Sequence, residues 1–198
     1  MTSDDAPSVA GGPSGDGGTR DGVILALVAR GDDSAFEQFV GAYQDHVARM
    51  AYRLLGWSGE VQDVVQEVFL AALKDLGRFR GQSSLSTWLT AITVNECRKR
   101  RRKWRLAAGF LAEWVRRPGS TPIRVEGGLL EDERLDRVRR AVAGLKMPLR
   151  EVTVLRYFQE MPIEEVARAL GLSVTAVHTR LHRARSRLKE TLSGLVEE

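Results

Sequence analysis

The sequence predicts an all-α protein that consists of two small helical domains joined by a flexible linker. Apolar residues recur at spacings of three and four over most of the chain, which is the period of amphipathic helices and not of strands. Glycine and proline interrupt this pattern and cluster at residues 116–128. A segment of that length has an r.m.s. reach of about 20 Å, enough for its two sides to move independently. The length of 198 residues suffices for two small cores.

The N-terminal part of the chain is expected to begin with a disordered tail at 1–20, which is rich in glycine and proline and nearly without apolar side chains. The apolar pattern starts at Val23 with a short helix. The next helix is expected to begin with a capping box of Ser34 and Glu37 and to end at Gly56. This second helix has the clearest apolar face in the sequence.

The next two helices complete a first domain. A third helix is predicted to start near Ser58, with apolar side chains inward and acidic side chains outward. After a short loop, Ser84 can cap a fourth helix that leads into a basic run at 98–105. We expect these four helices to form a domain at 21–105, followed by the linker at 106–128.

A second helical domain is expected at 129–192, where Pro148 and Pro162 stand at positions that open helices. The last two helices, at 163–187, have the spacing of a helix-turn-helix. The positions that need a close helix approach, a left-handed turn residue and a core contact hold Ala167, Gly171 and Val177.

The last helix carries short polar and basic side chains that suit base edges and phosphates in a major groove. These candidates are Ser173, Thr175, His178, Thr179, His182, Arg183 and Arg185. An ordinary hairpin with a solvated basic surface is the alternative, but residues 168–189 hold six bases and no acid, which favours DNA. Although two of these side chains are histidines one turn apart, the recognition-helix position favours DNA over metal.

The basic run is the second candidate nucleic-acid site. Seven of its eight residues are basic, and aromatic, amide and hydroxyl side chains precede it. This composition suits single-stranded nucleic acid, whose bases stack on rings while cations hold the phosphates. A solvated helix end is the alternative, and the spacing of Trp88 with Leu85 and Ile92 equally fits a core residue. The candidates are Phe79, Arg80, Gln82, Ser83, Ser84, Trp88, Asn95, Arg98, Lys99, Arg101 and Arg102.

Composition excludes several functions. One cysteine and three histidines leave no disulfide framework and few metal ligands, so no metal or cofactor is expected. No apolar run approaches the roughly 20 residues of a membrane span, and a cytoplasmic protein is expected. The third helix carries an acidic stripe of Glu60, Asp63, Gln66 and Glu67. No nucleophile or phosphate-binding loop accompanies this stripe, so a solvated surface explains it better than an active site, and no enzyme is expected.

Motifs in both domains resemble those of bacterial RNA polymerase sigma factors of the sigma-70 family. The motifs that resemble region two of this family are Asp63-Val64-Val65-Gln66-Glu67-Val68-Phe69, Arg78-Phe79-Arg80-Gly81, Ser86-Thr87-Trp88-Leu89 and Val94-Asn95. The motifs that resemble region four are Pro148-Leu149-Arg150, Glu164-Glu165-Val166-Ala167 and Arg180-Leu181-His182-Arg183-Ala184-Arg185. The linker leaves no room for a domain three, as in the extracytoplasmic function (ECF) group.

The resemblance implies a function for each candidate set. The acidic helix would dock on the β′ clamp helices of core RNA polymerase through Glu60, Asp63, Gln66, Glu67 and Phe69. The loop after Phe79, with Asn95, would receive a flipped minus-ten base while the basic run holds the phosphates of the melted strand. The last helix would read the minus-thirty-five element, and its domain would dock on the β flap. The chain would thus direct promoter recognition, melting and transcription initiation, at a stress or envelope regulon, and an anti-sigma factor is a plausible further partner.

Two departures from the family pattern concern specificity. The recognition helix starts Thr175-Ala176-Val177-His178, where many relatives have glycine, threonine, valine and a fixed cation. Thr87-Trp88 stands where housekeeping members have two aromatic residues, so we expect less robust melting and stricter promoter choice.

Two other functions compete with the sigma factor. A stand-alone helix-turn-helix transcription regulator would bind duplex DNA tightly without polymerase. A DNA-processing enzyme would need a nucleophile, and the sequence offers no convincing one.

Overall fold

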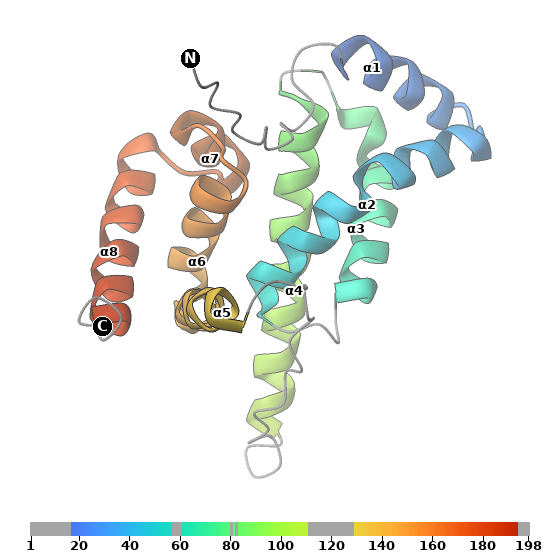
Figure 1. Ribbon diagram of the computed structural model, residues 1–198. Helices are drawn as coiled ribbons and strands as arrows, with labels where there is room; N and C mark the ends of the chain where they lie inside the picture. The colour runs from blue at the N-terminus through green and yellow to red at the C-terminus, as the bar shows by residue number, and fades with distance from the viewer. Residues whose placement is uncertain (1–16, 57–60, 80, 82, 111–128, 194–198) are drawn as a thin grey trace, which may run out of the picture.

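A computed structural model describes residues 17–56, 61–79, 81, 83–110 and 129–193. Every regular element in these ranges is a helix, as the sequence predicts (Figure 1). The first domain contains α1 (Gly17–Val28), α2 (Asp33–Leu55), α3 (Val61–Asp75), the 3-10 turn η1 (Leu76–Arg78) and α4 (Leu85–Phe110). The second contains α5 (Leu129–Gly144), α6 (Met147–Thr153), the π-helical turn η2 (Val154–Phe158), α7 (Ile163–Leu170) and α8 (Val174–Leu192). No helix within the described ranges is long and apolar enough to span a membrane.

The first domain is built on α2, α3 and α4, which pack on one another. Phe39 of α2 meets Phe69 of α3 edge to face, with ring centroids 5.4 Å apart, and both rings are buried. Such aromatic pairs stabilise a core beyond the area that they bury. The shorter α1 lies on α2, where the Tyr43 hydroxyl donates a 2.8 Å hydrogen bond to Asp21. Burial and this bond raise the pKa of Tyr43 above its usual value.

The N-terminal helix boundaries differ from those expected. The helix α1 begins at Gly17, so the last four residues of the predicted tail are helical, and residues 1–16 lie outside the described ranges. The cap of α2 is Asp32, whose carboxylate accepts a 3.0 Å bond from the Ala35 amide. The predicted capping box was therefore wrong, because an equally good cap lies two residues earlier and places Ser34 inside the helix.

The helix α4 is longer than expected and continues through 106–110, where the sequence pattern predicts the start of the linker. Its segment contains alanines, which favour helix. The predicted cap holds, because Ser84 accepts a 3.1 Å bond from the amide of Thr87. Residues 111–128 lie outside the described ranges.

The helix-turn-helix of the second domain is confirmed. Gly171 ends α7 with a φ of 65°, a left-handed conformation that glycine adopts without strain. Ser173 then caps α8 by accepting from the amide of Ala176 at 3.2 Å. Ala167 and Val177 are buried between the two helices, as predicted. In α5, by contrast, Leu135 is 51% exposed, although the helical period places it inward.

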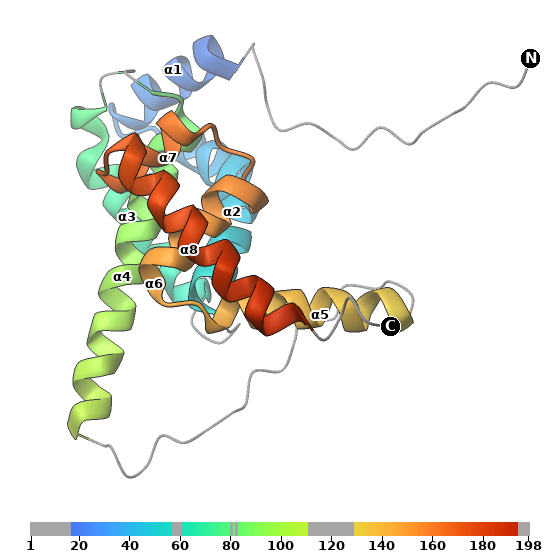
Figure 2. The ribbon, with the colours of Figure 1, turned by 90° about the vertical axis from the view of Figure 1, so that its left-hand side faces the viewer.

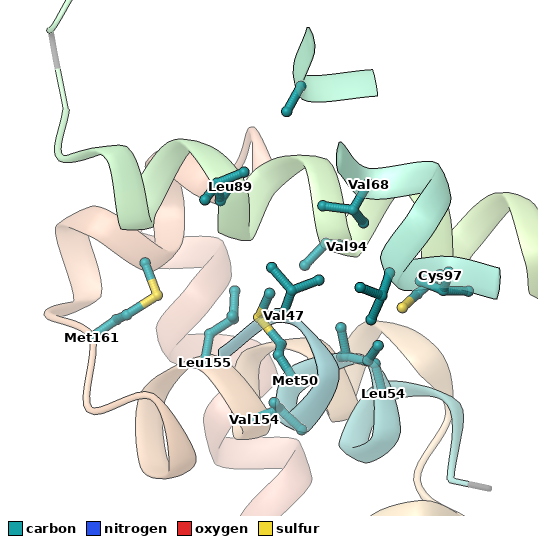
Figure 3. Packing of buried hydrophobic residues seen from close by; sticks show 14 of the residues in the cluster. Val47, Met50, Leu54, Val68, Leu89, Val94, Cys97, Val154, Leu155 and Met161 are labelled. Carbon is teal, nitrogen blue, oxygen red and sulfur yellow. The ribbon is translucent and has the colours of Figure 1, made fainter. Parts of the chain in front are cut away.

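The two domains lie against each other and share one apolar core (Figure 1). The helix α4 is packed on α2 and α3 and also on α7 of the second domain. Figure 3 shows Leu155 of the second domain near Met50 of α2, and Met161 of the second domain and Leu89 of α4 belong to the same buried cluster. The expectation of independent domains therefore does not describe this arrangement.

Candidate polymerase and DNA interfaces

The outer side of α3 combines acidic and apolar side chains, and we call it the α3 face. It consists of Asp63, Gln66, Glu67, Leu70 and Leu73, all of them exposed. Asp63 lies 3.5 Å from Arg100 of α4. Sequence reasoning missed Leu70 and placed Leu73 inward, yet they are 50% and 43% exposed. The available signal was that Leu70 follows Glu67 by three residues and Leu73 follows Leu70 by three.

Two residues proposed for this face do not join it. Phe69 is 4% exposed and packs on Phe39, so it is a core residue and not a contact residue, which corrects the expectation for it. The period explains the error, because Phe69 follows buried Val65 by four residues and thus lies on the inward side. Glu60 lies outside the described ranges.

The loop before α4 and the first turn of α4 carry the aromatic candidates. Phe79 and Trp88 are half-buried and pack on each other, with ring centroids 5.2 Å apart. Ser84 is exposed, but its hydroxyl caps α4 and lies 2.8 Å from the hydroxyl of Thr87. Ser83 is half-buried. Arg80 and Gln82, also proposed for this site, lie outside the described ranges.

Further along α4, four side chains make a basic and amide surface that we call the α4 face: Asn95, Arg98, Lys99 and Arg102. They line a hollow of about 530 Å³ between α3 and α4. Arg98 lies 3.5 Å from the amide oxygen of Asn95, and Lys99 forms a 2.7 Å ion pair with Glu96. The spacing of three and four residues places all four on one side of the helix.

Arg101 does not belong to the α4 face. It is half-buried and near enough to Cys97 and Arg150 to influence both. Burial, followed by the Arg101 charge, lowers the pKa of Arg150 to about 10. The thiol of Cys97 is buried, and this burial, with Glu151 and Glu96 nearby, raises its pKa to about 12. Arg101 therefore points to the interior of the molecule, and we no longer propose it as a phosphate contact.

The seven candidates of the recognition helix form the α8 face, and all of them are exposed: Ser173, Thr175, His178, Thr179, His182, Arg183 and Arg185. The hydroxyl of Thr179 donates to the carbonyl of Thr175 at 2.9 Å, and Ser173 caps the helix. The inward side is apolar and buried through Val177 and Leu181. The helix thus presents its polar side to solvent in full.

A groove of the second domain was not anticipated from the sequence. It has a volume of about 1150 Å³ and lies between α5, the start of α6 and the second half of α8. Its lining combines apolar Ala141, Leu145 and Leu149 with basic Arg140 and Arg187. No short motif marks it, because its lining comes from helices that are distant in sequence.

The comparisons with known proteins match both domains. Residues 39–106 match the family Sigma-70 region 2, and residues 135–188 match Sigma-70, region 4. The chain is 32% identical over 179 residues to the ECF RNA polymerase sigma factor SigW of Bacillus subtilis, a match that covers 86% of this chain and 96% of that relative. The chain belongs to the ECF RNA polymerase sigma factors. Such proteins direct transcription initiation and are regulators rather than enzymes.

Other relatives agree with this assignment. The sigma factor is 31% identical over 194 residues to the ECF RNA polymerase sigma-E factor of Escherichia coli K12, covering 89% of this chain and 96% of the relative. It is similar to CnrH in the solved structure of CnrH in complex with the cytosolic domain of CnrY, with a TM-score of 0.63, 31% identity, and coverage of 87% and 96%. RpoE from Bartonella quintana, solved with the anti-sigma factor NepR, shares the fold at a TM-score of 0.68 and 23% identity, with coverage of 80% and 96%.

Proposed function

We propose that this sigma factor binds core RNA polymerase through the α3 face and opens promoters by capturing the melted strand on the α4 face. The observation that carries the proposal is the division of exposed charge between the two helices. The α3 face presents Asp63 and Glu67, whereas the α4 face presents Lys99 and Arg102, all exposed. An acidic surface suits a basic protein partner and a basic surface suits a polyanion.

Docking on the β′ clamp helices would use charge and apolar contact together. Asp63 and Glu67 are one turn apart on α3, and Leu70 and Leu73 extend the same exposed side. Exposed leucines beside acids are typical of a protein interface, since apolar area supplies affinity and charge supplies orientation.

Strand capture would use the hollow beside the α4 face. A flipped minus-ten base would enter near Asn95, whose amide can both donate and accept, while Lys99 and Arg102 hold phosphates. The paired rings of Phe79 and Trp88 would cover the junction with the duplex. A protein that binds only unpaired bases shifts the duplex toward opening, so melting needs no ATP.

The α8 face would read the minus-thirty-five element in the major groove, with Arg183 and Arg185 on phosphates or guanine edges. The groove between α5 and α8 would receive the β flap, because its apolar lining and basic side chains suit an apolar segment with acidic neighbours. The helix α4 projects beyond the other helices (Figure 2), which lets it reach DNA while α3 is docked. The resemblance to this family supports the further proposal that the chain acts in the cytoplasm at a stress or envelope regulon.

A protein inhibitor is a further expected partner. CnrH, which is 31% identical, is solved in complex with the cytosolic domain of CnrY. An anti-sigma factor would cover the α3 face and the basic surface of the second domain, which are the surfaces needed elsewhere. The double substitution Asp63→Lys with Glu67→Lys should then weaken both polymerase and inhibitor binding. Intact binding of both would contradict this.

Co-elution with sigma-free core RNA polymerase on a sizing column tests the polymerase contact. The wild-type chain should co-elute, and the variant with Asp63→Lys and Glu67→Lys should not. The matched control carries Glu37→Lys and Asp45→Lys, the same charge change on exposed acids of α2, and should co-elute like the wild type. Equal co-elution of all three would contradict the assignment of the α3 face. Duplex binding by the chain alone, with no polymerase binding, would instead favour a stand-alone regulator.

A further inference from the structure

Two carboxylates of the second domain reach side chains of α4. Arg98 donates to Glu151 of α6 through Nε and Nη2, and both bonds measure 2.7 Å. Near the start of α4, the hydroxyl of Thr87 donates to Glu165 of α7 at 2.9 Å. Arg98 belongs to the α4 face, and Thr87 precedes Trp88. Both contacts therefore fall on the part of α4 that the melted strand would use.

The pair of Arg98 and Glu151 is built as a strong contact. Two parallel bonds between a guanidinium and a carboxylate are stronger and more specific than a single charge contact. The Glu151 side chain is 2% exposed, whereas that of Arg98 is 37% exposed. A buried carboxylate is stable only when it is paired, so Glu151 holds Arg98 as long as the domains stay together. The hydrogen bond from Arg98 to Glu151 also raises the pKa of Arg98.

Contacts from α2 hold the second domain in the same position. Arg150, next to Glu151, donates to the carbonyl of Leu54 at 2.7 Å and so satisfies an acceptor at the end of α2. Arg53 lies over the ring of Phe158, 5.0 Å from its centroid. These contacts hold α6 and η2 against α2, and they fix the position along α4 at which Glu151 meets that helix.

We propose that the free sigma factor inhibits itself, because its second domain occupies α4 groups that the promoter strand must take. Glu151 uses the guanidinium of Arg98 that would hold a phosphate, and Glu165 uses Thr87 beside the Phe79–Trp88 pair. A phosphate and Glu151 therefore compete for one cation. The inference rests on the proposed function of the α4 face.

The proposed self-inhibition also gives a role to Thr87, which stands where housekeeping members have an aromatic residue. Thr87 is 5% exposed and its hydroxyl bonds to both Ser84 and Glu165. Because the position is buried, a large ring there would have to displace the neighbours that Thr87 now contacts. Thr87 would thus stabilise the contact between the domains, whereas an aromatic residue at this position would favour promoter melting.

The test measures binding of a fluorescent oligothymidine of about 12 nucleotides to the free full-length chain by anisotropy, since stacking on rings tolerates any base. Glu151→Gln and Glu165→Gln each remove one carboxylate charge that faces α4. Glu164→Gln is the matched control, because it makes the same charge change at an exposed neighbour on α7. Circular dichroism verifies that the variants are as helical as the wild type, and the half-exposed position of Glu165 makes its variant the safer of the two.

We expect Glu151→Gln and Glu165→Gln to raise the affinity at least about tenfold, because the apparent affinity is proportional to the open fraction, which is small in a chain that is mostly closed. Glu164→Gln should match the wild type. Equal affinity of all four proteins would overturn the inference, as would an equal gain in the control. A holoenzyme with Lys99→Ala and Arg102→Ala tests the function beneath it. If that holoenzyme opens promoters like the wild type, the α4 assignment fails and the inference fails with it. If it does not open them, only the affinity comparison decides.

Discussion

The α4 face and the α8 face differ in their accessibility within one chain. All seven side chains of the α8 face are exposed. On α4, Asn95, Lys99 and Arg102 are exposed, but Arg98 is bound to Glu151 and Thr87 to Glu165. The helix α8 packs only its apolar side on its own domain, whereas α4 lies between the two domains (Figure 1).

This difference separates two steps of promoter recognition. The α8 face, which would bind duplex DNA, can stay exposed at all times, because weak contacts with duplex DNA do not interfere with initiation. A strand reader acts only after melting, and an exposed cationic strand site would bind any single strand in the cell. Engaging Arg98 and Thr87 of one DNA surface, while the other surface stays open, would favour strand binding in the state in which the domains have separated.

Loss of the deepest contact between the domains should have the largest effect. Arg150→Ala removes donors from the carbonyls of Leu54, Ala143 and Leu145, all of which lie at the junction. Each unsatisfied buried acceptor costs at least about 1 kcal/mol, so we expect a loss of about 3 kcal/mol in the free energy of unfolding. Arg183→Ala on the α8 face should change it by less than about 0.5 kcal/mol. Urea denaturation measures the free energy of unfolding of both variants. Equal losses for Arg150→Ala and Arg183→Ala would contradict the claim that the domain contact is buried and the α8 face is free.

A double-mutant cycle should give the next largest effect. The coupling energy of Arg98→Gln with Glu151→Gln should be about 1 to 3 kcal/mol, since one partner is buried and the pair is bidentate. The exposed pair of Arg187 and Glu190 on α8, 3.0 Å apart, should couple by less than about 0.5 kcal/mol. Chemical denaturation of the four proteins in each cycle supplies the numbers. A coupling near zero for the first pair would mean that it does not hold the domains together.

A pH effect is expected at His46, which lies two helical turns before Arg53 and so shares its side of α2. Burial, then the charges of Arg49 and Arg53, lower the pKa of His46. The unfolded chain therefore takes up the proton first, and the stability that neutral His46 confers is present above about pH 6.5 and is lost as pH falls further.

The wild type should lose more stability than His46→Gln between about pH 7.5 and pH 5.5, by at most about 1.4 kcal/mol per pH unit. Denaturant unfolding at the two pH values measures the difference. If the stabilities of the two proteins changed with pH in the same way, His46 would not be buried in the folded chain as the structure has it.

The smallest expected effect is on duplex binding. Because the α8 face is exposed in the closed chain, Glu151→Gln and Glu165→Gln should change the affinity for duplex DNA by less than about twofold. A salt titration of duplex binding should give the same slope for each variant and the wild type. A large gain in duplex affinity would show that both faces are closed together, and the comparison between them would fail.

Local signals allowed the helices of this fold to be predicted. Gly56 and Gly171 end α2 and α7 with left-handed φ values of 78° and 65°, and Ser84 and Ser173 cap the starts of α4 and α8. Each is a feature of a few adjacent residues. The α8 face was equally accessible to sequence reasoning, because a surface helix with a buried apolar side needs only its own period to be oriented.

Contacts between distant parts of the chain could not be predicted. Arg150 acts on a carbonyl 96 residues away, and Arg98 on a carboxylate 53 residues away. Thr90 and Thr93 of α4 are buried, although they are polar, because α4 has neighbours on two sides. For the same reason Arg101 turned inward although its basic neighbours suggested a phosphate contact. Periodicity tells which side of a helix is apolar, but not how many neighbours the helix has.

The interdomain distance in solution tests the central claim most directly. Spin labels on Gln38→Cys of α2 and Lys189→Cys of α8 occupy exposed positions, and the native Cys97 is buried with its pKa raised to about 12, which protects it from labelling. Pulsed electron paramagnetic resonance should give one narrow distance distribution for the free chain and a longer distance once core RNA polymerase is added. A free chain whose distribution is already broad and matches that of the polymerase complex would contradict the account.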